Sequence, residues 1–293
     1  MRFTKIQGTG NDFIVIDNRD GSIPRSMLAA TAARLCTRRV SVGADGMLVV
    51  EKPEQGCDFK MEYFNSDGSL GEMCGNGARC MARYAFENGI SGGFQRFETT
   101  AGIVEGERID EKNYRIRLND VTVMRRSVRV SVCGGEFECG YVELGDPGIP
   151  HAVVAVPGLK NADPVSLLET GRALRFAKEF PRGANVNFYD ITGEDEVTGL
   201  TYERGVEDFT LACGTGTASM VAFLTECGEV RGRNVRVSVP GGVLIIDIER
   251  TSDGTVRPYL TGLTNIVAEG RVRDEELQLT IDGRCVNLHR NEK

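Results

Sequence analysis

The chain has 293 residues, of which 41% are hydrophobic and 26% are charged, a composition typical of a globular protein with one or two domains. The 35 Lys and Arg residues against 42 Asp and Glu residues give a net charge of −7. This balance, without a long basic run, disfavours nucleic-acid and anionic-membrane partners. No apolar leader is visible and no apolar run approaches the roughly 18 residues of a membrane span. We therefore expect a soluble, cytoplasmic protein.

Cysteine usage bears on disulfides and metals. The chain has nine cysteines but only two histidines, His151 and His289, and it contains no Cys-x-x-Cys pair. An odd number of cysteines without a leader disfavours a disulfide framework, and this set of ligands disfavours a zinc site. We expect no metal, and we expect most of the cysteines to be small buried side chains.

In chain order, the expected elements are mostly strands. Alternating or β-branched segments bounded by Gly, Asp or Asn predict strands over 13–17, 47–51, 59–64, 115–123, 128–132, 151–156, 185–191, 197–203, 235–239, 242–248 and 277–281. Helical periodicity occurs over 26–39, 77–89, 165–180 and 216–228. Many strands with few helices predict an α+β fold rather than a parallel βαβ fold.

The sequence repeats internally. CGNGARCMARYAFENG (74–89) and CGTGTASMVAFLTECG (213–228) share Cys, Gly, Gly, Met, Glu and Gly in register. The segments that follow, FETTAGIVEGE and VSVPGGVLIID, also match, as do GNDFIVID and GIPHAVVAV before them. A duplication explains this pattern. It predicts two pseudo-symmetric domains, one from 1–119 with 264–293 and the other from 120–263.

Two cysteines stand at the repeated turns. Cys74 and Cys213 each precede a Gly-containing turn that opens a helix, where unpaired N–H groups and the helix dipole favour a thiolate and lower the pKa of cysteine. A single motif of this kind is more often a buried helix cap. A duplicated pair could face one another, with one thiolate removing a proton from a carbon and the other thiol returning one from the opposite side. The helix N–H groups would hold a substrate carboxylate and stabilise enolate charge.

Several polar residues lie at the ends of predicted strands near these turns. They are Asn11, Asn65, Asn185, Glu203 and Arg204. Each could be an ordinary turn residue, because Asn and Asp suit turns. Arg204 could also bind a carboxylate in a bidentate manner.

Together these motifs resemble the diaminopimelate epimerase family, the pyridoxal-independent isomerases of lysine and peptidoglycan-precursor biosynthesis. The resemblance is carried, in the family's order, by KIQGTGNDFIVID, GADGMLVVE, YFNSDGSLGEMCGNGARC, PHAVVAV, GANVNF, YERG, LACGTG and VPGG. It implies two similar strand-rich domains, each around a central helix, with the active site in the interdomain cleft. It also implies a small amino-acid substrate and no cofactor, and it leaves open whether the protein forms a homodimer.

The resemblance assigns roles to individual positions. It implies that Cys74 and Cys213 are the acid/base pair. The residues whose amides it implies for carboxylate binding are Gly75, Asn76, Gly214 and Thr215. The residues it implies for other substrate contacts are Asn11, Asn65, Asn185, Glu203 and Arg204.

The chain departs from the family pattern at two places. Where the family usually has Gly-Asn-Pro-His, this chain has Ile149 as the second residue, and the 206–210 segment is one residue longer than expected. Both changes fall where the distal end of diaminopimelate is expected, although Glu207 and Asp208 could replace a lost contact to its ammonium group.

The function therefore has alternatives. The leading one is epimerisation of LL- to meso-diaminopimelate, and the next is a racemase of another amino acid, such as histidine. A thiol redox protein, a metal-binding protein and a non-catalytic binding module are the others. A pyridoxal enzyme is disfavoured because only Lys5 lies near a matched motif.

Overall fold

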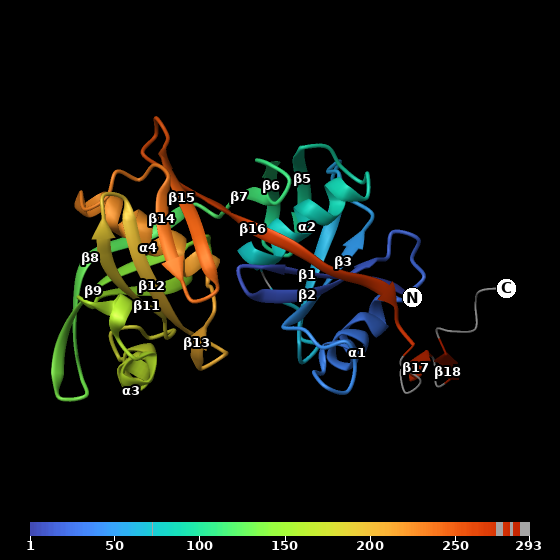
Figure 1. The fold of residues 1–293 in the computed structure, drawn as a ribbon, viewed down its shortest axis with the longest axis horizontal. Helices are drawn as coiled ribbons and strands as arrows, with labels where there is room; N and C mark the ends of the chain where they lie inside the picture. The colour runs from blue at the N-terminus through green and yellow to red at the C-terminus, as the bar shows by residue number, and fades with distance from the viewer. Residues whose placement is uncertain (72, 274–277, 282–283, 288–293) are drawn as a thin grey trace. The chain divides into compact units, whose positions relative to one another are not determined.

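The computed structural model describes residues 1–71, 73–273, 278–281 and 284–287 (Figure 1). The chain forms two compact units. Unit 1 contains Met1–Tyr114 and the chain from Thr264 onward, and unit 2 contains Arg115–Leu263. His289 lies outside the described residues.

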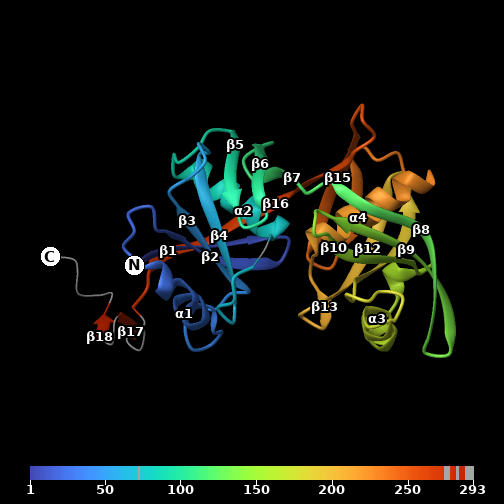
Figure 2. The same ribbon diagram turned by 180° about the vertical axis from the view of Figure 1, so that it is seen from behind.

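Unit 1 is a closed ring of strands around a helix. Its elements are β1 (Arg2–Gly8), β2 (Asn11–Asp17), α1 (Arg25–Cys36), β3 (Gly46–Glu51), β4 (Phe59–Asn65), α2 (Gly75–Glu87), β5 (Phe94–Thr99), β6 (Gly102–Arg108), β7 (Asn113–Arg117) and the second part of β16 (Val256–Arg271). The strand order is β1-β2-β3-β4-β5-β6-β7-β16, and β16 pairs with β1 to close the ring. Every residue of α2 from Gly75 to Ala85 is buried, and the helix packs against β1, β2 and β6, so α2 lies inside the ring (Figure 2).

Unit 2 repeats this arrangement. Its elements are β8 (Val121–Val132), β9 (Gly135–Leu144), β10 (Ile149–Ala155), the 3-10 turns η1 (Leu159–Asn161) and η2 (Pro164–Leu167), α3 (Leu168–Arg175), β11 (Asn185–Gly193), β12 (Glu196–Glu203), β13 (Asp208–Thr210), α4 (Gly214–Cys227), β14 (Val235–Val239), β15 (Gly242–Arg250) and the first part of β16. The order β8-β9-β10-β11-β12-β14-β15-β16 is closed by a bridge from Val256 to Val121. Helix α4 is buried along most of its length and packs against β8, β9, β10, β11 and β15.

After these rings, β17 (Gln278–Ile281) and β18 (Arg284–Asn287) form a two-stranded antiparallel sheet. Among the described residues, no helix combines the length and the apolar character needed to cross a bilayer.

The helices connect parallel strands, which corrects one expectation. The parallel pairs β2–β3 and β4–β5 flank α1 and α2, and the pairs β10–β11 and β12–β14 flank α3 and α4. Parallel neighbours need a crossover connection, and the helices provide it. The fold is therefore a strand-rich mixed α/β fold: the expected excess of strands is present, but parallel pairs joined by helices occur alongside the antiparallel ones, which the α+β expectation did not include.

One expected strand is divided. The segment 115–123 forms the end of β7 and the start of β8, with a break between Arg117 and Val121. Asp120 in this break accepts hydrogen bonds from Arg257 Nε at 3.1 Å and from Arg117 Nη2 at 3.5 Å. The adjacent polar residues Asn119 and Asp120 interrupt the alternation at this break, as turn residues do.

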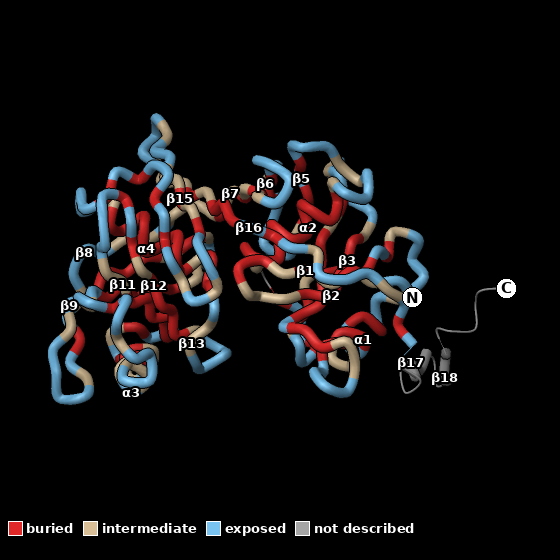
Figure 3. The backbone as a smooth tube through the Cα atoms, in the orientation of Figure 1, coloured by how far each residue is buried: buried red, intermediate tan, exposed pale blue. Residues whose placement is uncertain are grey.

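Two layers of packing explain why the central strands read as continuous apolar runs. In unit 1, Ile14 and Ile16 of β2 pack with Leu28 and Leu35 of α1, outside the ring. Phe13 lies on the other side of β2, against the helix inside the ring. A strand covered on both faces lacks the apolar–polar alternation of a half-exposed one. Figure 3 shows the resulting buried segments in each unit.

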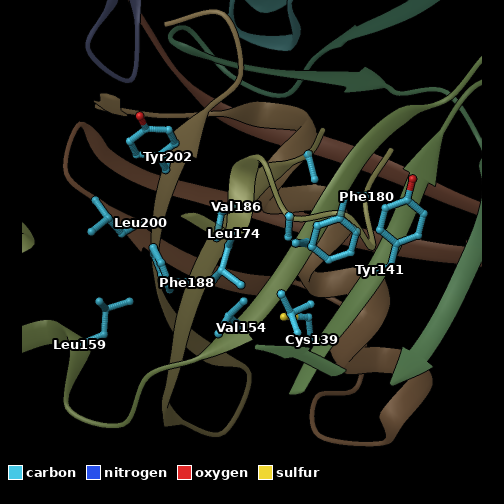
Figure 4. Close-up of a cluster of buried hydrophobic side chains, with 14 residues drawn as sticks. Cys139, Tyr141, Val154, Leu159, Leu174, Phe180, Val186, Phe188, Leu200 and Tyr202 are labelled. Carbon is cyan, nitrogen blue, oxygen red and sulfur yellow. The ribbon is translucent and has the colours of Figure 1, made fainter. Parts of the chain in front are cut away.

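Unit 2 has the corresponding outer core beneath α3 (Figure 4). Leu174 of α3 is fully buried in a cluster with Val186 and Phe188 of β11. Tyr141 and Phe180 stack there with ring centroids 5.4 Å apart. Each unit thus fixes its strands between an inner and an outer helix, which holds the N-terminus of the inner helix in place.

Candidate active site

Cys74 is the N-cap of α2. Its backbone is extended, its carbonyl oxygen accepts the first helical hydrogen bond from Ala78 N at 2.8 Å, and its sulfur accepts from Gly77 N at 3.4 Å. The space at Gly77 is tight, because a Cβ there would lie 3.2 Å from Leu48 Cδ2 and 3.5 Å from Cys74 Cβ. The sequence-predicted turn is therefore a helix cap that points backbone N–H groups toward the thiol and its surroundings.

The structure brings Asn11 and Asn76 to Cys74. Asn11 Oδ1 lies 3.6 Å from Cys74 Sγ and 3.4 Å from Asn76 Nδ2. On its other side, Asn11 Nδ2 donates to Asp45 Oδ2 at 2.8 Å. Three of the residues named from the sequence in unit 1 thus form one cluster at the start of α2.

A buried arginine lies beneath this cluster. Arg79 is fully buried, and its Nη2 donates to Asn76 Oδ1 at 2.6 Å and to Thr9 Oγ1 at 3.2 Å. Burial lowers the pKa of the Arg79 guanidinium. The sequence reasoning missed this residue, although its place one helical turn after Asn76 is a signal that could have identified it.

Asn65 is placed at the end of β4, opposite Gly46 of β3. Its Nδ2 donates to Ser69 Oγ at 2.9 Å, and its backbone N–H donates to Ser69 O at 2.9 Å. The amide is thus fixed by the turn that follows the strand.

Cys213 is the N-cap of α4 in unit 2. It is 7% exposed, and its carbonyl oxygen accepts hydrogen bonds from Thr217 N and Thr217 Oγ1, both at 2.9 Å. Its sulfur lies 3.7 Å from Thr215 Oγ1. The repeated motif therefore produces the same cap twice, but a hydroxyl takes the place beside Cys213 that the Asn11 amide takes beside Cys74.

A buried polar network surrounds the start of α4. Asn187 Nδ2 donates to Ala152 O at 3.0 Å, and Asn187 Oδ1 accepts from Thr201 Oγ1 at 3.0 Å. A Cβ at Gly216 would lie 2.2 Å from Asn187 Oδ1 and 3.2 Å from Cys213 Sγ. Gly216 belongs to the glycine turn singled out from the sequence, whereas Asn187 was not identified, because the strand pattern of 185–191 does not distinguish an inward-facing amide from an outward-facing one.

His151 lies in the same network. It is fully buried, and its Nδ1 is 3.3 Å from Asn187 Nδ2, whereas its Nε2 has no hydrogen-bond partner among the described residues. Burial and the charge of Arg204 lower the pKa of His151 to about 3. The imidazole is therefore neutral at physiological pH, and Asn187 Nδ2 is placed to donate to its Nδ1.

Asn185, Glu203 and Arg204 form a second group. Asn185 Oδ1 accepts from the backbone N–H of Arg204 at 2.8 Å, which fixes the end of β12. Arg204 is exposed and its Nη1 donates to Arg182 O at 3.3 Å, while Glu203 Oε2 accepts from Thr210 Oγ1 at 3.0 Å.

The 206–210 segment is a hairpin turn. Asp208–Thr210 forms β13, which pairs with β12. Glu207 forms an ion pair with Arg175 at 3.1 Å and also accepts from Gly205 N at 3.0 Å. These contacts all use Oε1 of a side chain that is 37% exposed, and a role of Glu207 in substrate binding stays a prediction.

Ile149 is the first residue of β10, as Asn11 is the first residue of β2. It is half-buried and pairs with Leu144 of β9. The repeat thus carries an alkyl side chain at the strand start in unit 2 where unit 1 carries an amide.

Among the described residues, no group of three or more His, Cys, Asp or Glu side chains is placed to hold a metal ion.

Solved structures identify the fold class. The structure is similar to that of a probable proline racemase from Agrobacterium radiobacter, with a TM-score of 0.69, 18% identity and 92% of each chain covered. It is also similar to a hydroxyproline epimerase from Agrobacterium vitis, with a TM-score of 0.67, 18% identity and 94% of each chain covered. At this identity the likeness shows the fold alone.

The sequence identifies the family within this class. The family model described as diaminopimelate epimerase matches residues 3–138 and 145–266. A diaminopimelate epimerase of Aquifex aeolicus is 39% identical over 95% of this chain and 100% of its own length, and one of Archaeoglobus fulgidus is 38% identical over 96% and 99%. The chain belongs to the diaminopimelate epimerase family, which confirms the resemblance, and it is an isomerase rather than a redox protein or a binding module.

Proposed function

We propose that the protein epimerises LL-diaminopimelate to the meso form without a cofactor, with Cys74 and Cys213 as the acid/base pair in a cleft between the two units. The observation that carries the proposal is the same cysteine-capped buried helix, built twice in one chain of this family. Both caps come from one chain, and the partner that we propose is the small amino-acid substrate; a homodimer is compatible with this chemistry.

The two proton transfers balance between Cys74 and Cys213. One cysteine, as the thiolate, takes the proton from the α-carbon, and the electron pair of the C–H bond moves into the α-carboxylate as an enediolate. The other cysteine, as the thiol, gives its proton to the opposite face of the carbon. After one turnover the two sulfurs have exchanged protonation states, so the product-bound pair is ready for the reverse reaction.

The helix starts would bind the reacting carboxylate. The backbone N–H groups of Gly75, Asn76, Gly214 and Thr215 lie in the first turns of α2 and α4, where such groups have no intrahelical partner. They would stabilise the negative charge that develops on the carboxylate in the transition state. The remaining substrate contacts would come from Asn11, Asn65, Asn185, Glu203 and Arg204.

Ile149 favours a second candidate, a racemase of an amino acid without a distal charged centre. An alkyl side chain neither donates to a carboxylate nor accepts from an ammonium, and a charged group left without a partner in a buried site costs a few kcal/mol. Family membership nevertheless favours diaminopimelate as the substrate.

We expect the wild-type protein to prefer LL-diaminopimelate over histidine. The Ile149→Asn variant should raise kcat/KM for diaminopimelate about 10- to 100-fold, since one hydrogen bond to a charged group is worth about 1.5–3 kcal/mol. The measurement is kcat/KM for both amino acids without pyridoxal phosphate. Ile149→Val, which keeps an alkyl group, is the matched control and should leave the preference unchanged. Racemisation of histidine without turnover of diaminopimelate would overturn the proposed substrate, whereas no gain from Ile149→Asn would show only that Ile149 does not limit recognition.

A further inference from the structure

The Asn11 amide is held in one orientation by a carboxylate. Asp45 Oδ2 lies 2.8 Å from Asn11 Nδ2, and an ionised carboxylate has no proton to donate. Only the NH2 group of Asn11 can therefore face Asp45, and its carbonyl oxygen must point the other way. That oxygen lies 3.6 Å from Cys74 Sγ.

Asp45 is itself fixed by neighbouring groups. Its Oδ1 accepts from Arg38 Nη2 at 2.8 Å, and its Oδ2 also accepts from the backbone N–H of Asp12 at 3.1 Å. The Asp12 carboxylate binds both Arg38 and Lys5. Burial alone would raise the pKa of Asp12, but the hydrogen bonds and charges of these two cations outweigh it and lower the pKa to about 2. The Asp12 carboxylate therefore stays ionised at physiological pH and keeps Arg38 beside Asp45.

We propose that Asp45 is a positioning residue that fixes the Asn11 amide with its oxygen toward Cys74 and thereby holds the proton on the Cys74 thiol. The inference rests on the proposed function in one respect, because it assigns a role to Cys74 as a proton donor. An oxygen that accepts from S–H stabilises the thiol, and it repels the lone pairs of a thiolate.

Other groups act on Cys74 in the opposite sense. Gly77 N donates to its sulfur at 3.4 Å, which favours the thiolate, and so does the positive charge of Arg79 on the same helix. Cys80, also on α2, is buried and its pKa is raised to about 12, so it stays a neutral thiol. Of the strands packed against α2, β1 carries Arg2 and Lys5, β2 carries Asp12 and Asp17, and β6 carries Glu105, Glu107 and Arg108. Lys5 and Asp12 join the Asp45 network, to which the loop between α1 and β3 contributes Arg38 and Asp45 itself. Gly77 N and Arg79 thus favour the thiolate of Cys74, whereas Asn11 Oδ1 favours its thiol. The orientation of the Asn11 amide sets the balance between the two forms.

Among the residues that the structure describes, unit 2 has no counterpart of this network. The strand starts of β2 and β10 correspond, and where unit 1 has Asn11 and Asp12, unit 2 has Ile149 and Pro150. Neither of the latter can orient an amide beside Cys213. The proposal therefore assigns Asp45 an effect on one cysteine of the pair.

The test is the pH dependence of Cys74 alkylation in the full-length protein. Iodoacetamide is the probe, and mass spectrometry of the Cys74 peptide gives the rate at each pH. In Asp45→Asn, the Asn11 amide is free to turn its NH2 group toward the sulfur, so the alkylation midpoint should fall by about one pH unit. The Asp45 side chain is 42% exposed, so this isosteric change leaves no cavity.

A double-mutant cycle separates positioning from charge. In an Asn11→Ala background, Asp45→Asn should shift the midpoint much less, because the amide that it orients is absent. Asp17→Asn is the matched control. It removes an ion-paired carboxylate from the end of β2 opposite to Asn11, and it should not shift the alkylation midpoint of Cys74. An equal shift with and without Asn11, or no shift at all, would overturn the proposal. Alkylation needs no substrate, so the shift of the midpoint tests the role of Asp45 even if the protein does not epimerise diaminopimelate.

Discussion

Cys74→Ala and Cys213→Ala should each reduce epimerisation of LL-diaminopimelate by about 10²- to 10⁴-fold or more, because each removes a proton-transfer partner from one face of the α-carbon. Cys80, the nearest cysteine in sequence to Cys74, is fully buried on α2, so its thiol cannot take over proton transfer in Cys74→Ala. The measurement is the rate of conversion to the meso form, with thermal unfolding to show that each variant is folded.

Cys227→Ala is the matched control for these variants. Cys227 is the last residue of α4, the helix that Cys213 caps, and it is exposed. Its replacement should leave the rate unchanged. Near-wild-type conversion by either Cys74→Ala or Cys213→Ala would refute the two-cysteine mechanism.

Gly216→Ala should reduce kcat about 100-fold, because a displacement of about 1 Å in a catalytic group has an effect of that size. The added Cβ would lie 2.2 Å from Asn187 Oδ1 and 3.2 Å from Cys213 Sγ. Asn187 is held by Ala152 and Thr201, so its amide cannot move without breaking buried hydrogen bonds. Overpacking of this kind should also lower the free energy of unfolding by about 1–3 kcal/mol.

Gly135→Ala provides the comparison in the same unit. A Cβ at Gly135 would meet Phe137 Cε2 at 3.5 Å, an ordinary contact, so both kcat and the unfolding free energy should stay close to those of the wild type. If Gly216→Ala retained wild-type kcat, the Asn187 network would not position Cys213.

The cysteine caps were predictable from the sequence because their signal is local. A thiol followed by Gly-x-Gly and an Ala- and Met-rich periodic segment predicts a helix start, and the structure begins α2 and α4 directly after Cys74 and Cys213. The buried runs of β2 and β3 were equally readable, since strands covered on both faces are continuously apolar.

Other features depend on contacts between distant segments. Asp45 lies in a loop between α1 and β3 and reaches Asn11 only because β2 and β3 pair in parallel. His151 and Asn187 meet because β10 and β11 pair in parallel, in a register that places His151 opposite Asn185. No local pattern in the sequence specifies that register. The βαβ connections were missed for the same reason: short strands between helices give no sign of which neighbours they pair with.

The incorporation of solvent deuterium tests the two-base mechanism most directly. LL-diaminopimelate would be incubated with the protein in D2O, without pyridoxal phosphate, and the α-hydrogens of substrate and product would be followed by NMR at early conversion. Two opposed thiols predict that the meso product carries deuterium at the inverted carbon, while the remaining LL-substrate keeps its hydrogen. Product that retained the substrate's own hydrogen, or deuterium that entered the LL-substrate before product formed, would show that one base serves both faces and would contradict the mechanism.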